Sequence, residues 1–526
     1  MYNRIPKKKI ASIGILFLLL LTAICTRFIN LGNLPNGTYT DEAYGAYLAY
    51  GEMTSGIDDR GYSFPVYFVA WGSGMNALYL YLGILSFKLF GVSLLAYRIP
   101  QALFSVLAIM ALYVIAKEFT NQKYAFIITL ALTLNPWHIM NSRFGLESNI
   151  APNMFLIACM FLVLGLKKTN KYFYPAALFL GLTLYCYAIT WLIVPLFLLI
   201  FMIVYWKRIP KNKTTLFSCI LLFLLALPLL IFLAINFDLL PEIRTPFFSI
   251  PKLSGFRGGE ISFDNLKQGI RNFIKVIVLQ QISPSVQFAL PSIGHYYYFT
   301  IPFMVFGLCM HLYKLIKHPT QIKNDLSYIF LIWLVCASLI SILNLHITLI
   351  HVNMVHIPII FYGAYGICEL CTLLRNKAIY YACIIFGIIS CGFFLSYYTQ
   401  TYDAEFYGNK PYDAVCRAKE LFPNHSITIY GYPTYKFPNL LWRDKPDMKD
   451  YAENKVYTDD PFFVELLEYK DYRFITFNDW DSVTFDGVYV ISRQNATDFI
   501  QRGFYIEDVN DLYAIAYAST PDLQKQ

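Results

Sequence analysis

Charged residues are scarce in this chain of 526 residues, at 14% against roughly 25% in an average soluble domain. Hydrophobic residues make up 57% of it, and several apolar runs reach the ~20 residues that cross a bilayer core as a helix. This composition excludes a soluble globular protein and predicts a polytopic membrane protein. The net charge of +8 does not indicate nucleic acid, because the basic residues fall in short clusters between apolar runs.

Several other familiar signals are missing. The 11 cysteines lie mostly inside apolar runs, so no disulfide framework is expected. The chain has no repeat of fixed period and no low-complexity tract. Its basic start and the apolar run at 10–23 resemble a signal peptide, but no small-residue cleavage site precedes Arg27. We therefore expect an uncleaved membrane anchor.

The basic clusters predict how the chain is oriented. Lys and Arg are enriched in cytoplasmic loops, so Lys7, Lys8 and Lys9 place the N-terminus inside. If the amphipathic stretch 76–90 lies at the membrane surface, every later basic cluster is also cytoplasmic. Counting that stretch as a span would instead move the clusters at 167–171 and 207–213 outside. The prediction is a polytopic helical membrane protein of about eleven spans, N-terminus in and C-terminus out, with interfacial helices in the first outer loop.

The predicted spans are separated by these basic or polar turns. The first four spans lie at about 10–29, 98–116, 124–137 and 150–166. The fifth and sixth form a hairpin that turns at 185–191. The next three lie at about 215–236, 296–313 and 327–344, the tenth ends near residue 375, and the last lies at about 378–397.

From about residue 398 the composition becomes that of a soluble domain. Its expected strands are 427–430, 474–477, 488–491 and 512–517, and its expected helices are 413–421, 461–469 and 496–502. We therefore divide the chain into a membrane domain, 1–397, and a small α/β domain, 398–526, outside the plasma membrane.

Two adjacent carboxylates, Asp41 and Glu42, follow the first span in a polar segment. In the simplest interpretation they complement the dipole of a helix whose N-cap is Thr40. Neighbouring helical residues point ~100° apart, so this pair cannot clasp one substrate atom as paired glycosidase carboxylates do. One would act and the other position it. Any second acidic partner must then come from another part of the chain. In the predicted topology, one other short outer loop has an acid near the end of a span, and that acid is Glu147.

Four stretches between about residues 30 and 165 together resemble a known family. They are Pro35-x-Gly37 followed by Asp41-Glu42-Ala43, Leu89-Phe90-Gly91 leading to Tyr97-Arg98-Ile99-Pro100, Asn135-Pro136-Trp137-His138, and Ser142-Arg143-Phe144-Gly145 with Glu147. In this order they resemble the GT-C glycosyltransferases, in particular the branch that contains protein O-mannosyltransferases and bacterial lipid A aminoarabinose transferases.

The resemblance implies transfer of a sugar from a polyprenyl-phosphate carrier to an acceptor hydroxyl on the outer face of the membrane. By position, Asp41 would be the catalytic base, with Glu42 as its neighbour, and Glu147 would match a second-loop acid that is usually Asp in relatives. A basic first-loop residue beside a Lys-Pro-Pro motif, expected in the aminoarabinose enzymes, is absent here, where 72–76 reads Gly-Ser-Gly-Met-Asn. A phosphate leaving group needs little protonation, so one general base suffices, and direct displacement predicts inversion.

The departing phosphate needs positive charge or hydrogen-bond donors nearby. Arg143 is favoured because it stands beside Glu147, and its alternative role is an interfacial Arg that reaches the headgroups. His351 and His356 lie near the outer end of two spans, where relatives often carry Arg, and they are further candidates for the carrier phosphate. Structural hydrogen bonding is their alternative. Their spacing places them ~140° apart on a helix, which suits a shared metal ion poorly.

The sequence thus predicts a membrane enzyme that uses a lipid-linked sugar as its donor. No cofactor is indicated, and neither is a divalent metal, although the sequence does not exclude one. The acceptor is a glycan, lipid or protein, and nucleic acid is not expected as a partner. Two alternatives stay open: a transporter or flippase of lipid-linked sugars, and a ligase or polymerase that uses pyrophosphate-linked glycans.

Overall fold

The computed structural model describes residues 7–71, 73–256, 262–281, 289–344, 347–401, 409–431, 437–460, 464–477 and 479–518. The chain divides into two compact units. The first comprises Met1–Leu31, Arg98–Leu230 and Gly258–Tyr402, and the second comprises Gly32–Tyr97, Ile231–Arg257 and Asp403–Gln526. The second unit therefore combines the first predicted outer loop with the C-terminal part of the chain.

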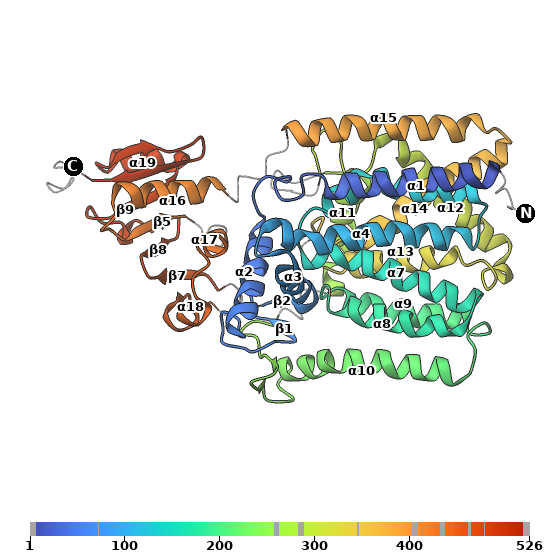
Figure 1. The fold of residues 1–526 in the computed structure, drawn as a ribbon, viewed down its shortest axis with the longest axis horizontal. Helices are drawn as coiled ribbons and strands as arrows, with labels where there is room; N and C mark the ends of the chain where they lie inside the picture. Colours follow the sequence, from blue (N-terminus) through green and yellow to red (C-terminus); the bar gives the residue numbers. More distant parts are fainter. Residues whose placement is uncertain are drawn as a thin grey trace, which may run out of the picture. The chain divides into compact units, whose positions relative to one another are not determined.

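Apolar helices that run alongside one another make up most of the first unit (Figure 1). They are α1 (Lys7–Phe28), α4 (Leu94–Lys117), α5 (Gln122–Leu134), α6 (Pro136–Asn141), α7 (Glu147–Lys167), α8 (Phe173–Leu184), α9 (Thr190–Tyr205), α10 (Lys213–Asn236), α11 (Leu266–Phe273), α12 (Ile301–Lys317), α13 (Tyr328–Ile342), α14 (Asn353–Leu374) and α15 (Ala378–Thr401). The start of α4 and the end of α10 belong to the second unit.

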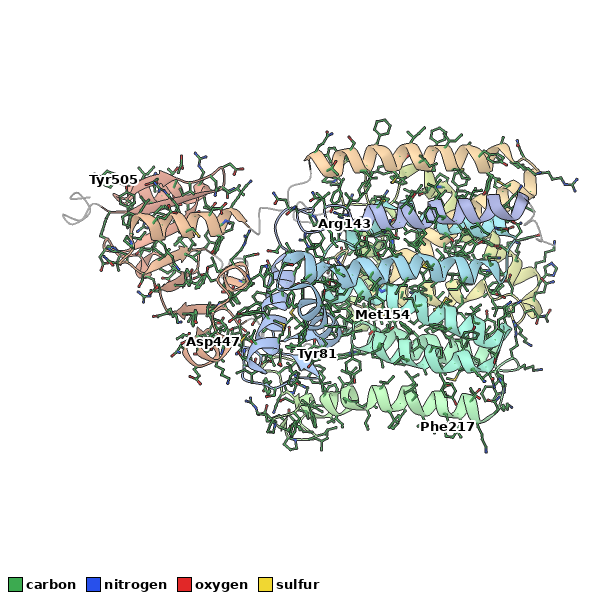
Figure 2. All side chains as sticks on the ribbon, viewed as in Figure 1. Tyr81, Arg143, Met154, Phe217, Asp447 and Tyr505 are labelled. Carbon is green, nitrogen blue, oxygen red and sulfur yellow. The ribbon has the colours of Figure 1, made fainter. Side chains whose placement is uncertain are left out.

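Within the described residues, six helical segments are long and apolar enough to cross a membrane. They are Leu94–Lys117, Glu147–Lys167, Lys213–Asn236, Tyr298–Lys317, Asn353–Leu374 and Ala378–Gln400. Shorter apolar helices include α5, α9 and α13. Large apolar side chains face outward from these helices, as a lipid environment requires; Phe217 on α10, labelled in Figure 2, is 51% exposed. The prediction of a polytopic helical membrane protein is confirmed.

The sequence Asn135-Pro136 explains why the third predicted span ends early. A residue before proline is restricted to extended conformations, and Asn135 has φ −66° and ψ 130°. Helix α5 ends there, and Pro136 opens α6 at a position where its missing N–H costs nothing. The Asn135 side chain accepts a hydrogen bond of 3.0 Å from the backbone N–H of His138, which caps the new helix.

The first-loop part of the second unit contains both helices expected there. They are α2 (Thr40–Ser55) and α3 (Ala77–Phe90), accompanied by the two-residue strands β1 (Tyr67–Phe68) and β2 (Met75–Asn76). The segment Ile231–Arg257 of the same unit contributes two more short strands, β3 (Ile243–Arg244) and β4 (Ser249–Ile250). Close packing against Tyr97 requires glycine at Gly45, where an added Cβ would lie 2.5 Å from the Tyr97 hydroxyl. The expected N-cap is one residue off, because Tyr39 holds that position and Thr40 is already helical.

The C-terminal part folds around a mixed sheet of seven strands in the order β10-β11-β9-β5-β8-β7-β6. Strand β5 is central and runs parallel to both β8 and β9, whereas the other pairs are antiparallel. The elements are α16 (Asn409–Leu421), β5 (Ile427–Tyr430), α17 (Phe437–Asp444), α18 (Met448–Asn454), β6 (Val456–Tyr457), β7 (Leu466–Tyr469), β8 (Tyr472–Ile475), β9 (Val488–Ser492), α19 (Ala496–Gln501), β10 (Tyr505–Asp508) and β11 (Tyr513–Tyr517).

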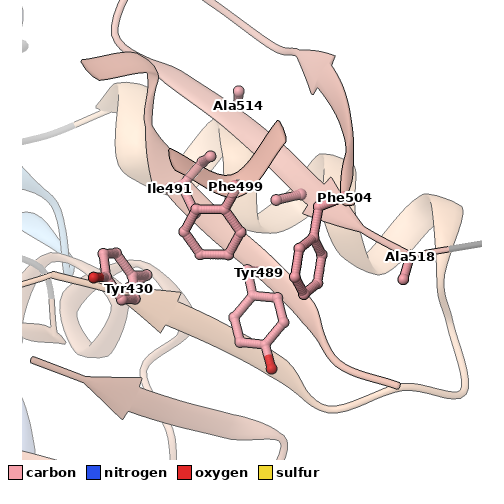
Figure 3. Close-up of a cluster of buried hydrophobic side chains, with 8 residues drawn as sticks. Tyr430, Tyr489, Ile491, Phe499, Phe504, Ala514 and Ala518 are labelled. Carbon is pink, nitrogen blue, oxygen red and sulfur yellow. The ribbon is translucent and has the colours of Figure 1, made fainter. Parts of the chain in front are cut away.

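One face of this sheet is covered by an aromatic core, shown in Figure 3. Its buried members are Tyr430, Tyr489, Ile491, Phe499, Phe504, Ala514, Ala516 and Ala518. The sequence patterns located four of the strands and two of the helices within a few residues. The helix expected at 461–469 is wrong, because its described C-terminal half is strand β7, which pairs with β8 at a tight turn.

Candidate functional site

The two adjacent carboxylates lie in the first turn of α2 and differ in burial. Glu42 is fully buried, whereas Asp41 is half-buried and keeps access to its surroundings. This difference follows from the ~100° between neighbouring side chains on a helix, since only one of the two can turn toward the interior of the unit. Asp41 is therefore the carboxylate of the pair that a substrate can reach.

The side chain of Trp71, in the same unit, contacts Asp41. The indole N–H of Trp71 donates a hydrogen bond to the Asp41 carboxylate. Burial raises the pKa of Asp41 to about 6, and the bond from Trp71, which favours the ionised form, limits this rise. The carboxylate is consequently ionised at neutral pH, yet it is more basic than an exposed aspartate. Both properties suit a general base.

Trp71 is itself fixed by aromatic rings. Its ring centroid lies 5.0 Å from that of Tyr44 on α2 and 5.2 Å from that of Phe437 on α17. Phe437 also meets Tyr44 edge-on at 5.7 Å. The backbone of Trp71 has φ 57°, a left-handed conformation that costs a residue with a side chain roughly 1 kcal/mol. Tertiary contacts must hold it there.

A second acidic group is buried nearby in the same unit. Glu52, Asp58 and Asp59 are between 0% and 2% exposed. Two tyrosine hydroxyls, of Tyr44 and Tyr457, each donate a 2.7 Å hydrogen bond to Asp59 Oδ2. Asp58 Oδ1 accepts from the backbone N–H groups of residues 60 and 62 at 2.9 and 2.8 Å. The other oxygens, Glu52 Oε1, Asp58 Oδ2 and Asp59 Oδ1, have no partner among the described residues.

Burial and mutual repulsion change the proton affinity of this group. Burial, followed by the charge of Asp58, raises the pKa of Glu52 to about 8, and burial followed by the charge of Asp59 raises the pKa of Asp58. Both values exceed the ordinary ones of about 4, so the folded protein binds more protons than the unfolded chain between pH ~4 and ~8. The free energy of unfolding must therefore fall as pH rises through that window.

We expect Glu52→Gln to remove part of this pH dependence. The apparent Tm of the wild type should fall as pH increases from about 5 to about 8, and the variant should show a shallower fall and a Tm about 2–4 °C higher at pH 8. Thermal unfolding in detergent at several pH values measures both. Asp238→Asn, at a residue that is 76% exposed, is the matched control. Parallel curves for wild type and Glu52→Gln would contradict the prediction.

Glu147 and Arg143 flank the junction between α6 and α7 in the first unit. Glu147 is half-buried and opens α7, where a carboxylate complements the helix dipole. Arg143 is 2% exposed, and its guanidinium donates to the carbonyl oxygens of Thr26 at 2.9 Å and Ile29 at 2.7 Å, around the end of α1. Its contact with the carrier phosphate stays a prediction. Because Asp41 belongs to the second unit and Glu147 to the first, their pairing also stays a prediction.

Arg98, at the start of the predicted span 98–116, is fully buried. It donates to the carbonyl oxygen of Leu31 at 3.2 Å and lies 5.5 Å from the ring of Phe144. Like Arg143, it thus helps to hold the end of the first helical segment against the α6–α7 junction.

A network of buried amides joins four helices beside Glu147. Asn149 Oδ1 accepts from the side chains of Asn141 at 2.9 Å and Asn353 at 3.0 Å, and Gln101 donates to the carbonyl oxygen of Asn141 at 3.1 Å. Asn353 also donates to the carbonyl of Ser148 at 3.3 Å. These bonds fix the start of α7 to the start of α14, so Glu147 and the predicted histidines share one end of the first unit.

The two predicted histidines have different surroundings. His351 is half-buried in the turn before α14, and its Nδ1 lies 2.9 Å from Thr348 Oγ1. His356 is fully buried in α14, with its Nδ1 2.5 Å from the Tyr296 hydroxyl and its ring 4.3 Å from that of Trp137. These contacts agree with the structural alternative for His356. A phosphate role for either residue stays a prediction.

No group of three or more His, Cys, Asp or Glu side chains in the described parts of the chain is arranged to hold a metal ion. Sequence reasoning missed the roles of Trp71, Phe437, Asp59 and Tyr457. The available signal was the aromatic richness of 62–71, which does not single out Trp71.

The chain is similar to known proteins in part of its sequence and in its fold. Residues 77–232 match the family model described as dolichyl-phosphate-mannose-protein mannosyltransferase. No protein of curated function matches the chain. Among solved structures, ArnT from Cupriavidus metallidurans in the apo state is 11% identical with a TM-score of 0.58, and the match covers 96% of this chain and 98% of ArnT.

Two further structures extend the likeness. ArnT from the same organism bound to undecaprenyl phosphate is 13% identical with a TM-score of 0.54, covering 97% and 99% of the two chains. The apo oligosaccharyltransferase of Archaeoglobus fulgidus is 15% identical with a TM-score of 0.52, covering 83% of this chain and 64% of that one. The fold is therefore that of ArnT, and residues 77–232 are similar to the dolichyl-phosphate-mannose-protein mannosyltransferases.

Proposed function

We propose that this protein transfers a glycosyl residue from a polyprenyl-phosphate-linked sugar to an acceptor hydroxyl on the outer face of the plasma membrane. The match of residues 77–232 to the mannosyltransferase family is the observation that carries this proposal. The complex of ArnT with undecaprenyl phosphate supports a lipid-linked donor, since the two proteins share a fold. The family match also favours an enzyme over a transporter of lipid-linked sugars.

In this proposal Asp41 is the general base. It accepts the proton of the acceptor hydroxyl while the oxygen attacks the anomeric carbon and the carrier phosphate departs, so the configuration inverts. The half-buried carboxylate and its raised pKa support this role. Glu42 is the neighbouring, positioning carboxylate, Glu147 is the second acid, and Arg143, His351 and His356 are the candidates for phosphate contacts.

The orientation of the chain is part of the proposal. The eleven helices α1, α4, α5, α7, α8, α9, α10, α12, α13, α14 and α15 coincide with the predicted spans, which supports the count. We place the N-terminus in the cytoplasm, the membrane domain at 1–397, and both Asp41 and the domain 398–526 outside. Labelling of a cysteine introduced at position 41 tests this, because reaction from the cytoplasmic side alone would exclude it.

The donor is tested with purified protein in lipid nanodiscs supplied with a labelled polyprenyl-phosphate sugar and cell-envelope acceptors. Sugar transfer with release of polyprenyl monophosphate is expected. The likeness to an oligosaccharyltransferase makes a ligase that uses pyrophosphate-linked glycans the second candidate. Transfer only from a pyrophosphate-linked glycan, with polyprenyl pyrophosphate as the lipid product, would favour that candidate and overturn the first. Mass spectrometry of envelope glycans with and without the protein identifies the sugar.

The pH dependence of transfer follows from the pKa of Asp41, about 6. A general base works only when it is ionised, so kcat/KM should be constant above about pH 7 and fall about tenfold per unit below pH 6. Initial rates between pH 4.5 and 8 at low donor concentration measure this limb. A limb centred near pH 4, the value of an exposed aspartate, would show that Asp41 is not held as described.

A further inference from the structure

We propose that Trp71 is a positioning residue for Asp41 and that the C-terminal domain holds Trp71 in place through Phe437 and Val464. The C-terminal domain would then contribute to the transferase site by fixing the position of Trp71. This inference rests on the proposed function, because it takes Asp41 as the base.

The direct contact is the hydrogen bond from the Trp71 indole to the Asp41 carboxylate. An N–H donor of fixed direction orients one carboxylate oxygen, and it stabilises the ionised form over the protonated one. The remaining oxygen is free to be directed at an acceptor hydroxyl. Trp71 therefore has two effects on the base: it sets the direction of its lone pairs and the pH at which it ionises.

The position of Trp71 depends on residues that come much later in the chain. Its carbonyl oxygen accepts a hydrogen bond of 3.1 Å from the backbone N–H of Val464. The ring of Phe437, at 5.2 Å, closes one side of the indole, while Tyr44 of α2 lies at 5.0 Å. Phe437 is 1% exposed and so has little freedom to move. Residues of the C-terminal domain thus contact both the backbone and the ring of Trp71.

Further contacts attach the same part of the C-terminal domain to α2. Thr38, just before α2, donates to the buried side chain of Asn439. The Tyr47 hydroxyl donates to the carbonyl oxygen of Pro446 at 3.2 Å. Gly51 leaves room for Met448, whose Cε would lie 2.1 Å from an added Cβ. Figure 1 shows α17 and α18 next to α2, within one compact unit.

The buried acidic group of the same unit makes other contacts. Asp59, Arg60 and Tyr457 form their own contacts, with Tyr457 donating to Asp59 and the Arg60 guanidinium 4.2 Å from the ring of Tyr457. Glu52 and Asp58 hold backbone N–H groups of the loop that follows α2. Trp71 is therefore the residue whose removal should change the ionisation of Asp41 without a change of net charge.

The test is the pH profile of kcat/KM for Trp71→Phe, which keeps an aromatic ring and removes the N–H donor. The midpoint of the acidic limb should move to higher pH by up to about one unit, and the plateau rate should fall about tenfold, with the donor KM little changed. Phe437→Ala should move the midpoint in the same direction by less, and Phe437→Leu, which restores most of the volume, should move it back toward the wild type.

Trp480→Phe is the matched control, since Trp480 packs against the core of the C-terminal sheet. It should leave the limb unchanged. A wild-type midpoint in Trp71→Phe, in protein with a wild-type unfolding temperature, would overturn the inference. If Phe437→Ala fails to fold, Phe437→Leu and Trp71→Phe still decide the question. Full activity of Asp41→Asn would instead reject the base assignment itself, so the two failures are distinguishable.

Discussion

Asp41→Asn is expected to lower the rate of sugar transfer by about 10²–10⁴-fold, because the amide cannot accept the proton of the acceptor hydroxyl. The side chain keeps its size, so donor binding should be nearly unchanged and the loss should appear in kcat. The variant should also lose the acidic limb of its pH profile, since that limb reports the ionisation of this carboxyl. Single-turnover transfer from a labelled polyprenyl-phosphate sugar in nanodiscs separates binding from chemistry.

Two comparisons make the result specific. Asp238→Asn removes an acid whose side chain is 76% exposed and paired with Lys252, and it should transfer sugar at the wild-type rate. Glu42→Gln changes the buried neighbour, and we expect a smaller loss than for Asp41→Asn because Glu42 is fully buried and cannot meet the acceptor. An Asp41→Asn variant with more than about a tenth of wild-type kcat would exclude Asp41 as the base.

The helical part of the fold follows closely from the sequence. Long apolar runs bounded by basic residues leave few alternatives in a bilayer, so the helices fall where hydropathy and charge place them. Local chemistry also sets individual boundaries, as at Asn135-Pro136, where a cap and a proline end one helix and start another. The prediction failed at 466–469, because this run becomes a strand only by pairing with β8. The periodicity of a local sequence does not reveal which strands will pair.

The candidate site was predictable only in part, for a similar reason. Asp41 and Glu42 stand out because acids are rare in this chain and these two follow a span directly. Trp71 does not stand out among 42 tyrosines, 44 phenylalanines and 7 tryptophans. What distinguishes it is its contact with Phe437 and Val464, from a distant part of the chain, and its left-handed backbone. Neither property is visible in a local pattern.

The local sequence around Arg143 also fails to show its contacts, and these contacts predict a large loss of stability when Arg143 is replaced. Its position beside Glu147 indicates a phosphate ligand, but its guanidinium donates to the carbonyl oxygens of Thr26 and Ile29. Those carbonyls lie around the end of α1, where helical partners run out. Arg143 thus joins α1 to the α6–α7 junction, and a structural role is sufficient to account for its burial.

Arg143→Ala should therefore destabilise the protein, by roughly 3 kcal/mol, because two hydrogen bonds from a charged donor are lost and two buried carbonyls are left without a partner. A lower unfolding temperature and less folded protein in membranes are the expected results, with Arg143→Lys intermediate, since an ammonium cannot hold both carbonyls in one plane. Arg417→Ala, at an exposed ion pair with Glu507, is the control and should have almost no effect. If Arg143→Ala instead unfolds like the wild type while its KM for the lipid-linked donor rises at least tenfold, the guanidinium binds the carrier phosphate and the structural explanation is wrong.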